Sequence, residues 1–88
     1  MYYVYILHSK KDNRLYIGRT DNLKRRIAEH KRGSVISTKN RLPIELIFYE
    51  AFLSNKDSTT REKYLKSGFG RQQLKFLIKD IFDKLRIK

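Results

Sequence analysis

Two short runs near the start of the chain alternate aliphatic with aromatic or small polar residues, and this alternation constrains the fold most. Residues 2–8 and 14–20 are rich in tyrosine, valine and isoleucine, which suits β-strands, and the turn-forming residues 9–13 separate them. Val4 and Ile6 occupy one set of alternate positions in the first run. Because a slip of one residue would turn every side chain over, we expect the aliphatic residues of both runs to share one buried face.

Tyrosines occupy the opposite face of this expected hairpin. Tyr5 and Tyr16 fall on the same side of the sheet when the aliphatic residues are buried together. Pairing these two tyrosines directly would place residue 8 opposite residue 13 and leave a loop of four residues. Taken alone, two such tyrosines are more often cross-strand packing than chemistry.

The next segment predicts a helix from Asp21 or Asn22 to Arg32, with Thr20 or Asp21 as its cap and Gly33 as its stop. Its inner face is marked by Leu23 and Ile27, which are four residues apart.

Two polar residues of this helix lie on or beside the inner face. At about 100° per residue, His30 projects beside Leu23, and Arg26 lies further round, at the edge of the face. Polar side chains on the apolar face of a helix depart from the usual hydrophobic pattern, and such departures often mark a functional site. Taken singly, His30 is more often a semi-buried histidine with satisfied hydrogen bonds, and Arg26 is more often solvated surface.

The second half of the chain predicts one strand and two helices. Residues 43–52 are apolar on both faces except for two glutamates, so we expect a strand that Pro43 begins and that is covered on both sides. A helix capped by Ser54 or Ser58 reaches about Lys66, where Gly68 and Gly70 break it. A last helix over 71–85 carries a full apolar stripe: Leu74, Leu77, Ile78, Ile81, Phe82 and Leu85.

The order strand, strand, helix, strand, helix, helix predicts an α+β fold with a small, mainly antiparallel sheet flanked by helices. With 88 residues, the chain is expected to form a single domain over 1–88.

Charge indicates the partner. Lysine and arginine total 21 against 9 acidic residues, a formal net charge of +12. Such an excess of positive charge favours a polyanionic partner, and nucleic acid is the obvious one.

No cysteine is present, which excludes a disulfide scaffold and a thiolate zinc site. The start of the chain has no basic leader, and no apolar run reaches membrane-spanning length, so we expect a cytoplasmic protein that does not enter membranes.

Four motifs, in order, resemble those of GIY-YIG nucleases. The tripeptide Tyr16-Ile17-Gly18, followed by Arg19-Thr20, is similar to the second signature, and Tyr3-Val4-Tyr5 occupies the position of the first. The segment 21–33, with its arginine and then its histidine, resembles the helix that follows. The stretches 46–50 and 61–66 resemble the third strand and a helix that bears a glutamate. The resemblance covers nearly the whole chain and is greatest to compact stand-alone bacterial members.

The resemblance implies a three-stranded antiparallel sheet with flanking helices, in the order β-β-α-β-α-α, and a metal-dependent phosphodiester hydrolase. Two features depart from the family pattern. Tyr3 replaces the first glycine of the signature, a scaffold position. An asparagine that some members carry in the helix after the glutamate has no counterpart: either Gln72 or Gln73 substitutes for it, or its role is absent.

The same resemblance assigns chemical roles to five residues. Tyr5 would be the general base, although a phenol with a reference pKa of about 10 needs a nearby cation or metal to ionise. Tyr16 would hydrogen-bond the attacking water or the phosphate, Arg26 would bind phosphate oxygens, and His30 would relay a proton or orient the phosphate. Glu62 would hold a single Mg²⁺ (or Mn²⁺). Taken alone, Glu62 could instead be a capping-box partner of Thr59.

Other basic residues are expected to contact phosphates without taking part in the chemistry: Arg19, Arg32, Lys39 and Arg41. His8 is expected at the surface, at the end of a strand, and Tyr3 and Tyr49 are expected to pack.

Three functions fit these features. The first is a Mg²⁺-dependent endonuclease acting on DNA, in repair or recombination. The second is a nucleic-acid-binding module that retains the fold with little chemistry. The third is a subunit whose protein partner supplies the specificity. No sequence-reading appendage is present, so the sequence predicts no preference for particular nucleic-acid sites or strands. It makes no prediction about the oligomeric state either.

Overall fold

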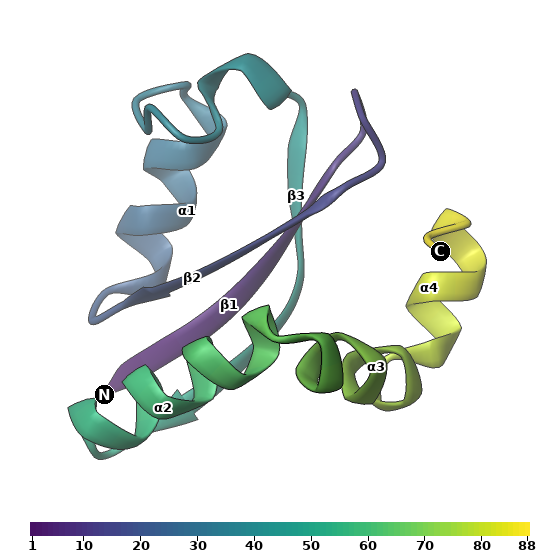
Figure 1. Cartoon of the computed structure of the whole chain (residues 1–88). Helices are drawn as coiled ribbons and strands as arrows, with labels where there is room; N and C mark the ends of the chain where they lie inside the picture. Colours follow the sequence, from purple (N-terminus) through teal and green to yellow (C-terminus); the bar gives the residue numbers. More distant parts are fainter.

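The computed structural model describes residues 1–88, which fold around a three-stranded antiparallel sheet (Figure 1). The strands are β1 (Tyr2–Ser9), β2 (Leu15–Thr20) and β3 (Ile44–Phe52), in the order β2-β1-β3. The helices are α1 (Leu23–Lys31), a 3-10 helix (Lys39–Arg41), α2 (Asn55–Lys66), α3 (Gly68–Leu77) and α4 (Lys79–Leu85). The predicted α+β fold is confirmed.

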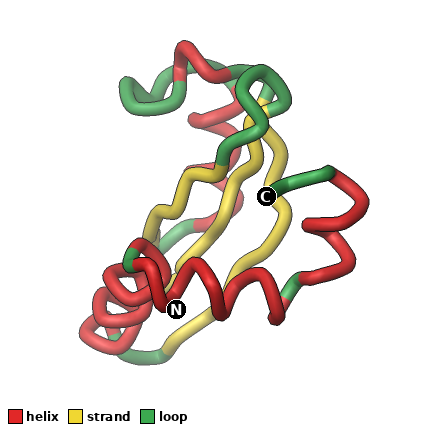
Figure 2. Tube along the Cα trace, turned by 45° about the vertical axis from the view of Figure 1, so that its right-hand side comes forward, coloured by secondary structure: helices red, strands yellow, loops and turns green.

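The two faces of the sheet carry different helices (Figures 1 and 2). On one face, the aliphatic residues of β1 and β2 pack against α2, α3 and α4 in a single core: Val4, Ile6, Ile17, Leu65, Leu74, Phe82 and Ile87. On the other face, Tyr5 and Leu7 pack with Leu23 and Ile27 of α1. The predicted division of faces is therefore correct, and it places the tyrosines beneath α1.

The observed register between β1 and β2 differs from the one in which Tyr5 would lie directly opposite Tyr16. Tyr5 lies opposite Gly18, and Tyr16 lies opposite Leu7. The four-residue loop falls at residues 10–13, where Asn13 takes a positive φ of 60° to close the turn. Because the offset between the two registers is even, both tyrosines keep the same face.

Strand β3 is an edge strand that has apolar contacts on both faces. Its pairing with β1 is interrupted by a β-bulge, since Ile6 lies opposite Phe48 and Leu7 lies opposite Leu46. The bulge brings both Ile47 and Phe48 to the core shared with α2–α4, and Leu46 packs on the other face. Cover on both sides was predicted from the apolar sequence of this strand.

Side-chain caps fix where α1 and α2 begin. Asn22 caps α1, and its side chain accepts a hydrogen bond from Arg25 N. Ser54 caps α2 by accepting from Asp57 N. Gly33, with a φ of +81°, follows α1 as predicted.

The single helix predicted over 71–85 is wrong. Ser67 caps α3, which begins at Gly68 and ends at Leu77, and Ile78 leaves helical geometry before α4 starts. A straight 15-residue helix would extend about 22 Å and carry its far end off the sheet. The break at Ile78 returns Phe82 to the core, where it is 3% exposed.

Candidate active site

Tyr5 and His30 form a buried hydrogen-bonded pair between β1 and α1. The Tyr5 hydroxyl and His30 Nε2 lie 2.8 Å apart, and both side chains are nearly inaccessible to solvent. Gly18 makes room for the phenol ring, because a Cβ at that position would lie 2.4 Å from the Tyr5 hydroxyl. The glycine of the second signature thus lets Tyr5 lie against the backbone of β2.

Thr38 completes this arrangement, and the sequence did not single it out. Its Oγ1 lies 2.7 Å from His30 Nδ1, and Thr38 is fully buried. Both ring nitrogens of His30 are therefore engaged, one by Thr38 and the other by Tyr5. Thr38 lies in a polar connection where an isolated threonine gives no signal in the sequence. Its role appears only once the loop after α1 is seen to fold back on the helix.

Tyr16 lies beside the same pair. Its ring centroid is 5.2 Å from that of His30 and 6.4 Å from that of Tyr5. Unlike Tyr5, it is only partly buried. It also lines a hollow of about 510 Å³ with Lys66 and Arg71. Tyr16 thus connects the buried pair with the open edge of β2.

Tyr5 and His30 are both held in their neutral forms. Burial raises the pKa of Tyr5 to about 12, and the nearby Arg26 opposes that rise. Burial and the charge of Arg26 lower the pKa of His30 to about 4. Near neutral pH the pair is therefore a phenol and an uncharged imidazole.

Arg26 lies at the edge of the site, as its helix position predicted. Its Nη1 is 3.1 Å from Glu29 Oε1, and its pKa is raised by Tyr5 and Glu29. Together with Arg19 and Arg25 it lines a hollow of about 390 Å³ beside β2. Asp21 and Glu29 line the same hollow and pair with Arg25 and Arg26. The guanidinium groups still outnumber the carboxylates, which suits phosphate oxygens.

Glu62 approaches from the other side of the sheet, on α2. Its carboxylate lies 3.8 Å from Arg19 Nε and 3.1 Å from Lys66 Nζ. Burial and Tyr16 raise the pKa of Tyr5, and the negative charge of Glu62 makes a smaller contribution in the same direction. The capping-box alternative is wrong, because Ser54 caps α2, which begins at Asn55, and Thr59 lies inside the helix, where its hydroxyl donates to Asn55 O.

The donor set fits a cation that needs few protein ligands. No three acidic or histidine side chains gather anywhere in the chain. Glu62 is one carboxylate, with its side chain 21% exposed. Mg²⁺ commonly binds one or two carboxylates and fills its other positions with water and phosphate oxygens, so Glu62 fits a magnesium-type site that the substrate completes.

The remaining predicted contacts are spread over the surface. Arg32 and Lys39 are exposed. Arg41 instead pairs with Asp12 at 2.9 Å, which ties the 3-10 helix to the loop between β1 and β2 and lowers the pKa of Asp12 to about 2. Gln72 and Gln73 are exposed on α3.

His8 is not at the surface as expected. It is 4% exposed, and its Nε2–H donates to Asn13 Oδ1 at 2.7 Å. Tyr3 and Tyr49 do pack, edge to face, with ring centroids 6.1 Å apart.

Comparison with known proteins shows what this arrangement belongs to. The family model described as the GIY-YIG catalytic domain matches residues 1–75. The chain belongs to the GIY-YIG family. Its GIY-YIG domain places it in a nuclease superfamily whose members generally depend on divalent metals and bind nucleic acid. No helix is both long enough and apolar enough to cross a membrane.

Its relatives within the GIY-YIG family are UPF0213 proteins. The chain is similar to one from Limosilactobacillus reuteri, with 37% identity over 90 residues, covering 99% of this chain and 93% of the relative. One from Clostridium perfringens is 38% identical over 78 residues, covering 88% and 83%. The solution NMR structure of a UPF0213 protein from Bacillus halodurans is 35% identical, covers 89% and 86% of the two chains, and aligns with a TM-score of 0.56.

Proposed function

We propose that this protein is a metal-dependent endonuclease that hydrolyses phosphodiester bonds of DNA. The observation that carries the proposal is the buried Tyr5–His30 pair, with Tyr16 beside it and the charge of Glu62 within reach. Packing alone gives no reason for a buried phenol, a buried imidazole, a guanidinium and a carboxylate to lie near one another. Phosphodiester hydrolysis uses all four groups.

Tyr5 is the proposed general base. For Tyr5 to take a proton from water, its own proton must leave, and His30 Nε2 is 2.8 Å away. If Nδ1–H donates to Thr38 Oγ1, Nε2 carries the free lone pair and accepts from the Tyr5 hydroxyl. In that tautomer Thr38 would hold Nδ1–H and leave Nε2 to receive the proton. Neutral His30 can accept the hydrogen bond from the Tyr5 hydroxyl. Its pKa near 4 makes it a weak base, so transfer of the proton itself would require the negative charge of a bound phosphate to raise that pKa.

Arg26 and Arg19 are proposed to hold the scissile phosphate. Both line the hollow beside β2, and the Nε atom of Arg19 is buried without a hydrogen-bond partner. The Arg19 guanidinium is already paired with Glu62 and Asn55. A phosphate oxygen would therefore bind Arg19 by displacing these partners, and after a turn of the side chain it could also accept from Nε. Tyr16 would orient the attacking water from the adjoining edge of β2.

Glu62 is the proposed metal ligand, for Mg²⁺ or Mn²⁺. A bound divalent cation would neutralise the negative charge that develops on the phosphate and on the leaving oxygen. Before it binds, Glu62 is held by Arg19 and Lys66. When the phosphate binds, it would draw Arg19 away and leave the carboxylate free.

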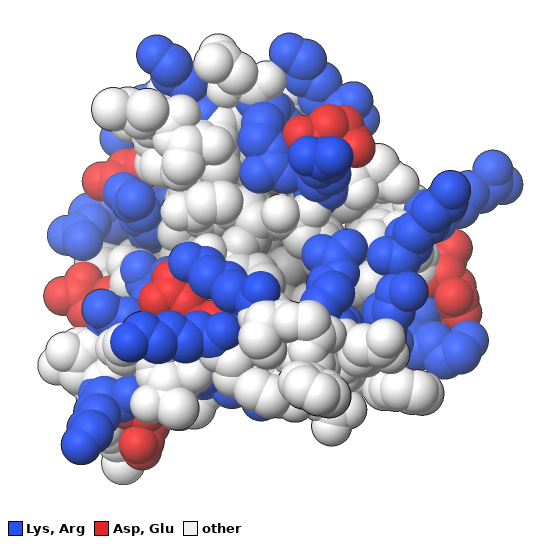
Figure 3. All heavy atoms as spheres, viewed as in Figure 1, with Lys and Arg blue, Asp and Glu red and all other residues white.

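The positive surface is proposed to hold the remaining nucleic acid. Figure 3 shows lysine and arginine spread over the visible face, with acidic side chains in small clusters bordered by basic ones. Arg32 and Lys39 are the proposed outer phosphate contacts. The ion pair of Arg41 with Asp12 would have to open before Arg41 could contribute.

Nicking of supercoiled DNA tests this function. The protein should convert the plasmid to open circles with Mg²⁺ and stop when EDTA is added. Glu62→Ala should abolish nicking, while Glu45→Ala, which removes an exposed carboxylate paired only with Lys10, should not. Equal activity of wild-type protein and Glu62→Ala would disprove the role of Glu62.

A non-catalytic nucleic-acid-binding module is the second candidate. The raised pKa of Tyr5 favours it, because a phenol with a pKa of about 12 is a weak acid and does not ionise readily. Under this alternative the protein binds DNA tightly in Mg²⁺ and leaves every substrate intact. If cleavage appears only when a cellular protein is added, that partner supplies what the isolated chain lacks.

A further inference from the structure

Helix α3 exposes two phenylalanines that no part of the proposed active site uses. Phe69 is 84% exposed and Phe76 is 76% exposed. Seven residues apart, they lie on the same side of the helix, separated by about 10 Å along its axis. Large apolar side chains that are exposed together on one helix face often mark a surface that binds a partner.

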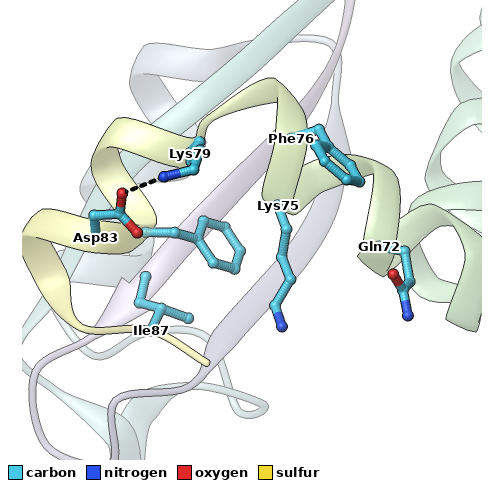
Figure 4. Close-up of a pocket in the computed structure, with 7 residues that line it drawn as sticks. Gln72, Lys75, Phe76, Lys79, Asp83 and Ile87 are labelled. Atoms are coloured by element: carbon cyan, nitrogen blue, oxygen red, sulfur yellow. Dashed lines mark hydrogen bonds and ion pairs between the residues drawn. The ribbon is translucent and has the colours of Figure 1, made fainter.

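A hollow lies beside Phe76, between α3 and α4 (Figure 4). Its volume is about 330 Å³, and its lining residues are Gln72, Lys75, Phe76, Lys79, Phe82, Asp83 and Ile87. Lys79 is held by Asp83 at 2.8 Å, as the dashed line in Figure 4 marks. The hollow therefore combines an aromatic wall with a fixed cation.

The surroundings of the hollow are positive. Residues 67–88 contain six basic and two acidic residues. Both acidic residues are already paired, Asp83 with Lys79 and Asp80 with Lys84. Lys75, on the wall of the hollow, has no carboxylate partner. Aromatic rings among unpaired cations suit a ligand that has both flat bases and phosphates.

This surface is separate from the proposed chemistry. The match to the catalytic domain family ends at residue 75, so Phe76 and the whole of α4 lie beyond it. A second copy of the chain is a poor occupant, because two molecules of net charge +12 repel each other.

We propose that Phe69, Phe76 and Lys75, together called the α3 face, bind an unpaired nucleic-acid strand. A base would stack on Phe76, and the adjoining phosphate would contact Lys75. This inference rests on the proposed function for its source of nucleic acid, and it adds a substrate class: DNA that carries a single-stranded segment. Stacking is tolerant of sequence, since every base presents a flat face.

Binding measured without cleavage tests the α3 face. In EDTA, fluorescence anisotropy is recorded with a labelled oligothymidylate strand and with a blunt duplex of equal length. Phe76→Ala should weaken binding of the strand by roughly tenfold and binding of the duplex by less than about twofold. Lys75→Gln should lower the salt dependence of strand binding by about one counterion.

Leu53→Ala is the matched control, because Leu53 is 85% exposed and lies outside α3 and α4. It should change neither affinity. Circular dichroism melting checks that Phe76→Ala, which removes a mostly exposed ring, remains folded.

Two results would overturn the inference. One is unchanged strand binding by Phe76→Ala, or an equal loss for strand and duplex. The other is a wild-type dimer in sedimentation that Phe76→Ala turns into monomers, which would make the α3 face a self-association surface. Neither result depends on cleavage, so a protein that binds through Phe76 without nicking DNA would refute only the proposed function.

Discussion

At the scale of single residues, the candidate site is a chain of hydrogen bonds from Thr38 through His30 to Tyr5. The inward position of His30 could be predicted, because helix geometry alone places it beside Leu23. Thr38 could not, because its place depends on how the connection after α1 folds. Glu62 was linked to the tyrosines by resemblance alone, and in the structure it lies 3.8 Å from Arg19 Nε and makes a small contribution to the raised pKa of Tyr5.

Burial of His30 predicts a loss of stability in mild acid. Its pKa is lowered to about 4 in the folded chain, against about 6.5 when unfolded, so only the unfolded state takes up a proton between these values. The free energy of unfolding should fall by roughly 2 kcal/mol from about pH 7 to about pH 5. Urea denaturation at the two pH values measures this change.

His30→Gln is the comparison variant, because it removes the titrating imidazole, and its free energy of unfolding should change less between the two pH values than that of the wild type. The ring resonances of His30 in NMR should stay those of a neutral imidazole throughout. If His30 takes up its proton near pH 6.5 in the folded protein, the buried neutral imidazole is excluded.

At the scale of elements, strand faces were predictable and helix ends were less so. The alternation in β1 and β2 settled which residues share a face, but the register depends on the turn, where Asn13 takes a positive φ. The break between α3 and α4 could not be predicted from the sequence, because no glycine or proline lies at that point. It exists because Phe82 and Ile87 reach the core only if the chain turns there.

The junction of α2 and α3 predicts opposite effects for two neighbouring glycines. A Cβ at Gly70 would lie 1.8 Å from Tyr64 O, whereas a Cβ at Gly68 would meet nothing within 4 Å. Gly70→Ala should lower the free energy of unfolding by about 2 kcal/mol or more, because backbone must move. Gly68→Ala should leave it unchanged or raise it by about 0.5 kcal/mol. Thermal melting of the two variants measures the contrast, and equal melting temperatures would contradict the close approach.

At the scale of the whole molecule, charge governs how the protein meets its partner. The net charge of +12 was apparent from composition, but which cations are free was not. Arg41 and Arg61 are held by carboxylates, at 2.9 Å from Asp12 and 2.8 Å from Glu50. The hollow beside β2 gathers Arg19, Arg25 and Arg26 at one place. Each of them is also paired with a carboxylate, Arg19 with Glu62, Arg25 with Asp21 and Arg26 with Glu29, so a bound phosphate would have to compete with these pairs.

Affinity for DNA should therefore depend steeply on salt. With about four phosphates neutralised, for example by Arg19, Arg26, Arg32 and Lys39, duplex affinity should fall roughly a hundredfold between about 50 mM and about 200 mM salt. Anisotropy titrations in EDTA at several salt concentrations give the slope. Binding that is indifferent to salt would be inconsistent with a phosphate-based interface.

Tyr5 is proposed to take part in phosphodiester cleavage in addition to packing between β1 and α1. The most direct measurement is the single-turnover rate of DNA nicking by Tyr5→Phe in Mg²⁺, compared with Tyr3→Phe. Tyr3 packs edge to face against Tyr49 and has no assigned chemistry, so it matches the change without touching the site. We expect Tyr5→Phe to slow nicking by about 100-fold or more and Tyr3→Phe to nick at close to the wild-type rate. Equal nicking rates for wild type and Tyr5→Phe would contradict this role of Tyr5.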